Sequence, residues 1–119
     1  MIEYHLAPDV EKSVHEIIRK LELRHSSDEI LCLRSHGSKA KKSFARTYKL
    51  SKENKVAIGV KALYAVEVIS ENFDGLTASA KIKTLIHELL HIAKKPADAF
   101  HTHKEVSRAR VEELYKRLH

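Results

Sequence analysis

The segment His87-Glu88-Leu89-Leu90-His91 carries two histidines four residues apart. On a helix, residues at this spacing lie one turn apart on the same face, so both imidazoles can bind one metal ion. Glu88 lies beside them, where a carboxylate can accept a proton from water that the metal activates. The H-E-x-x-H pattern therefore predicts a zinc site with His87 and His91 as ligands and Glu88 as the catalytic base.

A catalytic zinc site needs a third protein ligand and keeps its fourth position for water. Two histidines, His101 and His103, follow the motif at a useful distance. We favour His103, because a helix that begins near Thr102 would place it in the first turn, with His101 in the preceding loop as the alternative. A carboxylate such as Glu112 or Glu113 is the remaining alternative.

The spacing of apolar residues predicts the helices and strands that hold these residues in place. Helical stripes predict helices over 8–24 and 77–93, with Thr77 as the cap of the second. A third helix is predicted to begin near His103, because Thr102 and Glu105 have the spacing of a capping box. Short apolar or alternating runs predict strands at 30–33, at 43–50 and within 56–69. The sequence therefore predicts one α+β domain over 1–119, with an N-terminal helix and a mixed or antiparallel sheet of three or four strands.

Composition limits the classes of protein that need to be considered. The chain has 119 residues, enough for one domain, and a net charge of 22 − 16 = +6. One cysteine, Cys32, excludes an internal disulfide framework, and its apolar neighbours predict a buried thiol. No apolar run approaches the roughly 20 residues of a membrane span, and the first residues lack the pattern of a signal peptide. We therefore expect a cytoplasmic protein with no membrane partner.

Several segments together resemble a known family. Residues 64–74, the motif at 87–92, His103 and residues 111–115 look like the small zinc metallopeptidases of archaea and phages, which are similar to the SprT-like zinc proteases. The resemblance covers about residues 45–119. It implies a minimal zincin fold with His87 and His91 as ligands, Glu88 as catalytic base and His103, on the C-terminal helix, as third ligand. Relatives tend to have glycines in the loop before that histidine, but residues 93–100 have none, so His101 remains an alternative.

These features predict a zinc-dependent peptidase that hydrolyses peptide bonds with water activated by the metal. The substrate would be a peptide or protein, an unfolded one included, and it could pair with the strand at 64–69 if that strand is a sheet edge. Tyr48, Tyr64, Tyr115 and whichever of His101 and His103 does not bind the metal are candidates for stabilising the oxyanion. The alternative is a non-catalytic, zinc-stabilised module that binds nucleic acid or protein, and a hydrolase of non-peptide amides is a third hypothesis.

Basic residues gather in two parts of the chain. Such groups can bind a phosphate backbone, although a solvated loop and edge strand explain the first group as well. Nucleic acid is therefore an open alternative as a partner. The first group comprises Lys39, Lys41, Lys42, Arg46 and Lys49, and the second comprises Arg108, Arg110, Lys116 and Arg117.

Overall fold

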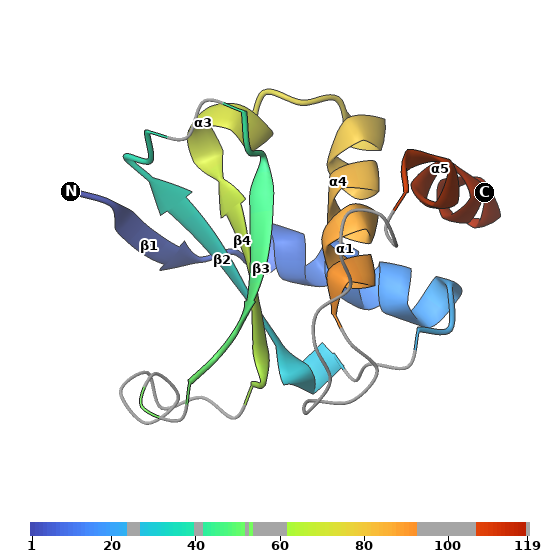
Figure 1. Cartoon of the computed structure of the whole chain (residues 1–119), viewed down its shortest axis with the longest axis horizontal. Helices are drawn as coiled ribbons and strands as arrows, with labels where there is room; N and C mark the ends of the chain where they lie inside the picture. The colour runs from blue at the N-terminus through green and yellow to red at the C-terminus, as the bar shows by residue number, and fades with distance from the viewer. Residues whose placement is uncertain (24–26, 40–41, 52, 54–61, 93–106, 119) are drawn as a thin grey trace.

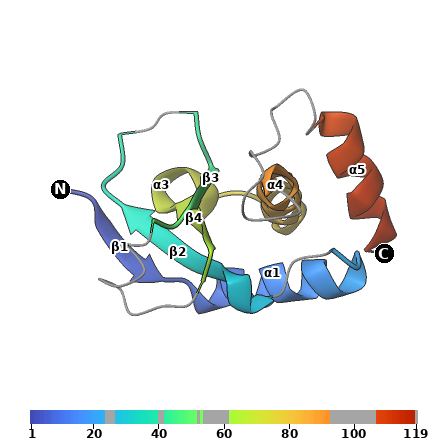
Figure 2. The same cartoon turned by 60° about the horizontal axis from the view of Figure 1, so that its bottom comes forward.

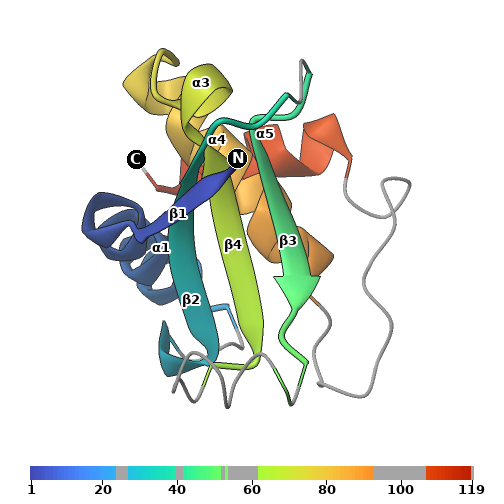
Figure 3. The same ribbon diagram turned by 90° about the vertical axis from the view of Figure 1, so that its left-hand side faces the viewer.

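A mixed sheet forms one side of the molecule in the computed structural model, which describes residues 1–23, 27–39, 42–51, 53, 62–92 and 107–118. Within these residues the sheet has four strands, in the order β1-β2-β4-β3 (Figure 1). They are β1 (Glu3–Leu6), β2 (Ile30–His36), β3 (Ala45–Lys49) and β4 (Tyr64–Ile69). The central pair, β2 and β4, is parallel, and β1 and β3 run antiparallel to their neighbours. Figure 3 shows the sheet face-on, with β3 at one edge.

The long helices lie on one face of this sheet (Figures 1 and 2). They are α1 (Pro8–Lys20), α4 (Ala78–His91) and α5 (Arg108–Arg117); a short 3-10 helix, η1 (Ser27–Glu29), precedes β2, and α3 (Ser70–Phe73) follows β4. Helix α4 contacts β3 on one side and α5 on the other, and it also touches α1. No helix among the described residues is long and apolar enough to cross a membrane.

The main core lies between the sheet and the helices. Alternate residues of β4, Tyr64, Val66 and Val68, are at most 1% exposed and face the helical layer. Burying side chains of this size stabilises the fold by about 1.5–3 kcal/mol each. The helices contribute their apolar stripes, which include Val10, Val14, Ile17 and Ile18 from α1 and Leu85, Ile86 and Leu89 from α4. This core fixes α4 against the sheet.

The structure confirms the α+β class and most of the predicted elements. The periodicity over 8–24 corresponds to α1, and the strands predicted at 30–33 and 43–50 correspond to β2 and β3. The cap predicted for the motif helix is present, because the Thr77 hydroxyl accepts a hydrogen bond from the Ala80 amide at 3.2 Å. The part of the 56–69 prediction before residue 62 lies outside the described residues.

Three expectations need correction. The C-terminal helix begins at Arg108 rather than near His103, since Ser107 is extended and accepts a hydrogen bond from the Arg110 amide at 3.1 Å. The strand at 64–69 lies in the interior of the sheet between β2 and β3, so it is not an edge that could pair with a substrate. The N-terminal strand β1 was not predicted, although Tyr4 and Leu6 alternate with Glu3 and His5; all four of its residues are exposed.

Candidate active site

The H-E-x-x-H segment occupies the last turns of α4, where the helix ends at His91. The stripe of Leu85, Ile86 and Leu89 faces the core and fixes the rotation of the helix about its axis. His87 and His91 are half-buried on a different face, as the helical phase predicts. The packing of α4 therefore decides where the two imidazoles point.

The two imidazoles converge. The Nε2 atoms of His87 and His91 are 3.0 Å apart, and the ring centroids are 4.7 Å apart with the planes at 70°. Two nitrogens bound to one tetrahedral zinc ion at 2.0–2.1 Å are about 3.3 Å apart. The pair therefore fits two ligands of a single metal ion with only a small adjustment.

The third ligand is not decided by the described residues. His101 and His103 lie outside them, and no group of three His, Cys, Asp or Glu side chains within the described residues could hold a metal ion. Of the carboxylate alternatives, Glu112 forms an ion pair with Lys83 at 3.0 Å, and Glu113 contacts Arg110 at 2.9 Å. The choice of His103 stays a prediction.

Glu88 is buried, with 8% of its surface exposed, and it has a specific partner on the sheet. The Thr47 hydroxyl lies 2.8 Å from Glu88 Oε2 and 3.2 Å from the main-chain oxygen of the same residue. The hydroxyl proton fixes the carboxylate from the side of β3. Sequence reasoning missed Thr47, because 41 residues separate it from Glu88. Because threonine suits a strand as well as its neighbours do, nothing in the sequence singles Thr47 out.

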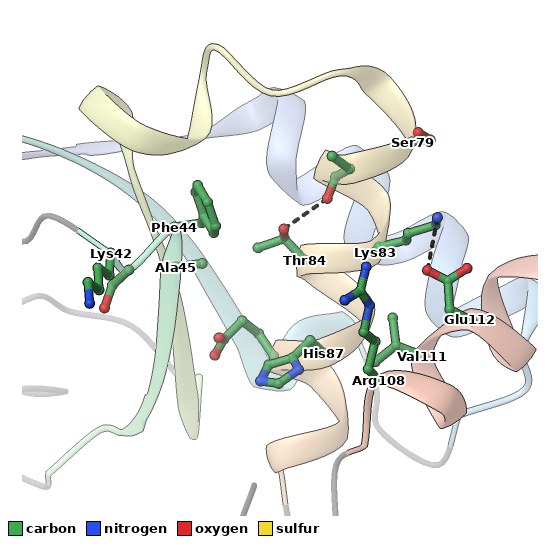
Figure 4. Close-up of a pocket in the computed structure, with 13 residues that line it drawn as sticks. Lys42, Phe44, Ala45, Ser79, Lys83, Thr84, His87, Arg108, Val111 and Glu112 are labelled. Carbon is green, nitrogen blue, oxygen red and sulfur yellow. Dashed lines mark hydrogen bonds and ion pairs between the residues drawn. The ribbon is translucent and has the colours of Figure 1, made fainter.

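A cleft of about 640 Å³ opens next to Glu88 and His87 (Figure 4). One wall comes from the segment that enters β3, including Lys42 and Phe44. The floor is the exposed side of α4, and the other wall is the start of α5 with Arg108. The predicted catalytic base thus lies at a cleft large enough for part of a peptide.

The chain matches the family described as Putative phage metallopeptidase over residues 2–114. It belongs to this family. The match extends from before β1 into α5, so it is wider than the resemblance over residues 45–119. No curated protein and no solved structure matches the chain. Membership of a metallopeptidase family implies a metal ion and a protein substrate.

In this member of the metallopeptidase family, none of the tyrosines considered for the oxyanion lines the described part of the cleft. Tyr64 is 1% exposed inside the core, and Tyr48 lies on the strand β3 but outside the lining. The ring of Tyr115 stacks under Lys83 Nζ, 4.8 Å from the ring centroid. We therefore assign no oxyanion role to these three residues.

Cys32 is buried in the core, as predicted. Burial raises the pKa of its thiol to about 12, because the charged thiolate would lose its hydration there. The thiol is therefore protonated at neutral pH and takes no part in the cleft chemistry.

Proposed function

We propose that the chain is a zinc-dependent peptidase in which His87 and His91 bind the metal and Glu88 is the catalytic base. The observation that carries this proposal is the convergence of the two Nε2 atoms, 3.0 Å apart, beside a buried carboxylate at the cleft. Membership of the metallopeptidase family supports the same assignment. His103 is the proposed third ligand, with His101 as its alternative.

Zinc bound at this site would lower the pKa of water toward 7 and polarise the carbonyl of the scissile bond. The carboxylate of Glu88 accepts the proton from the attacking water and then donates it to the nitrogen of the leaving amine. Thr47 acts through Glu88, since its hydrogen bond at 2.8 Å restricts the rotation of the carboxylate. A restricted base spends more of its time in the orientation that proton transfer needs.

The strand beside the cleft offers a way to hold an extended substrate. The bond from the Ile69 amide to the Phe44 carbonyl, at 2.9 Å, pairs Phe44 with β4. Bonding alternates along an antiparallel pair, so the backbone groups of Ala45 and Thr47 point to the outer edge of the described sheet. A peptide added along β3 would therefore pass next to Glu88 and form main-chain hydrogen bonds there. β3 replaces the strand at 64–69 as the proposed substrate edge.

The competing hypothesis of a non-catalytic zinc module explains the histidines but not Glu88. A structural zinc site needs no base, and burying a carboxylate costs free energy that a purely structural site has no reason to bear. The position of Glu88 between the imidazoles and Thr47 therefore favours catalysis. A hydrolase of non-peptide amides would use the same residues. An assay with a peptide substrate distinguishes the two, because only the proposed peptidase would cleave it.

Zinc content and hydrolysis, measured on the same samples, test the proposed function. We expect the purified full-length chain to retain about one zinc ion after dialysis and to cleave an unfolded protein such as reduced, alkylated casein. A chelator should abolish both, and added zinc should restore both. Retention of much less than one zinc ion would contradict the site, and zinc retention without cleavage of any peptide or protein substrate would favour the non-catalytic module.

A further inference from the structure

The cleft beside Glu88 is lined by positive side chains from three different elements. Lys42 precedes β3, Lys83 lies on α4 and Arg108 is the first residue of α5. Figure 4 shows the Arg108 side chain extending alongside α4, between Lys83 and His87. Arg108 and Lys83 therefore lie close together beside α4, whereas Lys42 lies apart from them at the rim of the cleft, beyond Phe44 and Ala45.

Among the described residues, the lining of this space has three cations, Lys42, Lys83 and Arg108, and two carboxylates, Glu88 and Glu112. Lys83 is neutralised by Glu112 at 3.0 Å, and Glu88 is buried against Thr47. Arg108 and Lys42 have no ion pair with any described residue. The cleft thus keeps two positive side chains for which the described residues provide no carboxylate.

Arg108 differs in this respect from the other arginines of its own helix. Arg110 and Arg117 both contact the Glu113 carboxylate, at 2.9 and 3.3 Å. Within the described residues, the two arginines of α5 that lie outside the lining of the cleft are paired with Glu113, whereas Arg108, which lines the cleft, has no ion pair. This contrast is the observation that separates Arg108 from an ordinary surface cation.

The wall opposite Arg108 is held in place by the sheet. The Asn72 side-chain amide donates to the Ser43 carbonyl at 2.7 Å, and the Ile69 amide donates to the Phe44 carbonyl at 2.9 Å. These bonds fix the backbone next to Lys42 and leave the Phe44 ring 43% exposed. The cleft therefore combines a fixed, partly apolar wall with cations, which suits a side chain that has a short aliphatic stem and a carboxylate.

We propose that this cleft selects an acidic side chain of the peptide substrate, with Arg108 as its partner. This inference rests on the proposed peptidase function and adds a substrate class to it. The planar guanidinium can donate two parallel hydrogen bonds to a carboxylate, a geometry that a lysine cannot provide. Glutamate or aspartate in the substrate would neutralise Arg108, for which the described residues provide no ion-pair partner.

Peptide binding tests the inference without any need for turnover. The probe is a set of three fluorescein-labelled peptides that are identical except for one Glu, Gln or Lys in an otherwise neutral sequence. Their affinities are measured by anisotropy for the zinc-loaded Glu88→Gln chain, which keeps the histidines and does not cleave. We expect the Glu peptide to bind about tenfold more tightly than the Gln peptide, a ratio equivalent to about 1.4 kcal/mol in binding free energy. The Lys peptide should bind most weakly.

Charge reversal at two positions on α5 distinguishes a direct contact between Arg108 and the peptide from an effect of the net charge of the protein. Arg108→Glu should abolish the preference for Glu and make the Lys peptide the tightest of the three. Lys116→Glu changes the net charge equally but lies outside the lining of the cleft, so the order of affinities should stay the same. Equal affinities for the three peptides, including no binding of any, would overturn the inference, as would the same response to both variants.

A cleavage assay with the wild-type chain and the same three peptides distinguishes failure of the inference from failure of the proposed function. Cleavage without a preference for Glu overturns the acidic subsite and leaves the peptidase standing. Preference in binding, with no cleavage of any peptide or protein, supports the subsite and overturns the peptidase. A single-stranded DNA oligonucleotide serves as a competitor in the binding assay. If it displaces all three peptides equally, and Arg108→Glu weakens this displacement, the cations bind a polyanion and the acidic-subsite inference is wrong.

Discussion

Two clusters of charged residues in this chain are built in opposite ways. In the first, Arg34 on β2 binds both oxygens of Asp9 at 2.8 and 2.9 Å and one oxygen of Asp74 at 3.0 Å. In the second, Glu88 has a hydroxyl partner in Thr47, and two imidazoles lie on the same helix with their Nε2 atoms 3.0 Å apart. The first cluster uses all three nitrogens of its arginine, whereas the second brings together groups that can each bind a metal or move a proton.

The difference indicates what each cluster does for the protein. The Arg34 cluster joins β2, α1 and the turn after α3, so its interactions stabilise the arrangement of elements. The Glu88 cluster joins β3 to α4 and faces a cleft. Changes in the first should therefore alter stability and leave chemistry intact, and changes in the second should do the reverse.

The largest effect is expected for His91→Ala. Removal of one of the two converging imidazoles should lower zinc affinity by more than about a hundredfold, since even outer-shell changes cost about 10–100-fold. Hydrolysis should fall with zinc occupancy. Competition with a zinc indicator measures the affinity, and His15→Ala, at a partly exposed histidine on α1, is the control that should change neither quantity. Unchanged zinc affinity in His91→Ala would remove this histidine from the site.

Thr47→Val should lower kcat about tenfold and leave KM and zinc content unchanged, because it removes the hydrogen bond that orients Glu88 but no ligand. Thr47→Ser keeps the hydroxyl and should restore most of the activity. Steady-state kinetics on one fluorogenic peptide provide the comparison. If the Val and Ser variants lose activity to the same extent, the hydroxyl has no positioning role.

Arg34→Met should lower the free energy of unfolding by about 1–3 kcal/mol, because it leaves two carboxylates without their shared donor. Zinc content and kcat should stay the same. Urea unfolding gives the stability, and Arg110→Met, which removes an exposed pair with Glu113, should cost less than about 1 kcal/mol. A loss of kcat in Arg34→Met at full zinc occupancy would contradict the separation of the two clusters.

The smallest effect is a pH dependence of stability that comes from Asp9. The hydrogen bonds from Arg34 lower the pKa of this carboxyl to about 2. A carboxyl whose pKa is lower in the folded chain stabilises the fold above its unfolded pKa of about 4, and it loses that contribution as the pH falls toward 2. The side chain is 65% exposed, so the contribution should stay below about 1 kcal/mol. The stability difference between wild type and Asp9→Asn should therefore be constant above about pH 5 and shrink toward pH 2; a difference that grows on acidification would contradict this account.

Local patterns were sufficient to predict the helices and the motif, but not how the elements pair. The stripe of Val10, Val14 and Ile17 and the Thr77 cap are encoded within a few residues, so α1 and α4 could be read directly. Sheet order depends on contacts between distant segments, which is why β4 could not be recognised as an interior strand. The start of α5 was placed too early because Thr102 and Glu105 have the spacing of a capping box, whereas the cap of α5 is Ser107, whose hydroxyl accepts a hydrogen bond from the Arg110 amide.

In the candidate site, too, the sequence predicts what lies on one helix but not what other elements bring to it. The spacing of His87, Glu88 and His91 indicates a shared metal from the sequence alone, since one helix determines their geometry. Thr47 and Arg108 come from other elements, and their position beside Glu88 exists only after β3 and α5 pack on α4. The basic residues likewise separate only in the structure: Arg46 contacts Glu67 at 3.4 Å, whereas Lys42 lines the cleft.

The most direct test of the central claim is the rate of peptide hydrolysis by Glu88→Gln at measured zinc occupancy. The amide keeps the size of the side chain but cannot accept the proton from water. We predict that this variant retains about one zinc ion per chain, as the wild type does, and hydrolyses peptide at least about a hundredfold more slowly. Hydrolysis at the wild-type rate with zinc bound would contradict the assignment of Glu88 as the catalytic base.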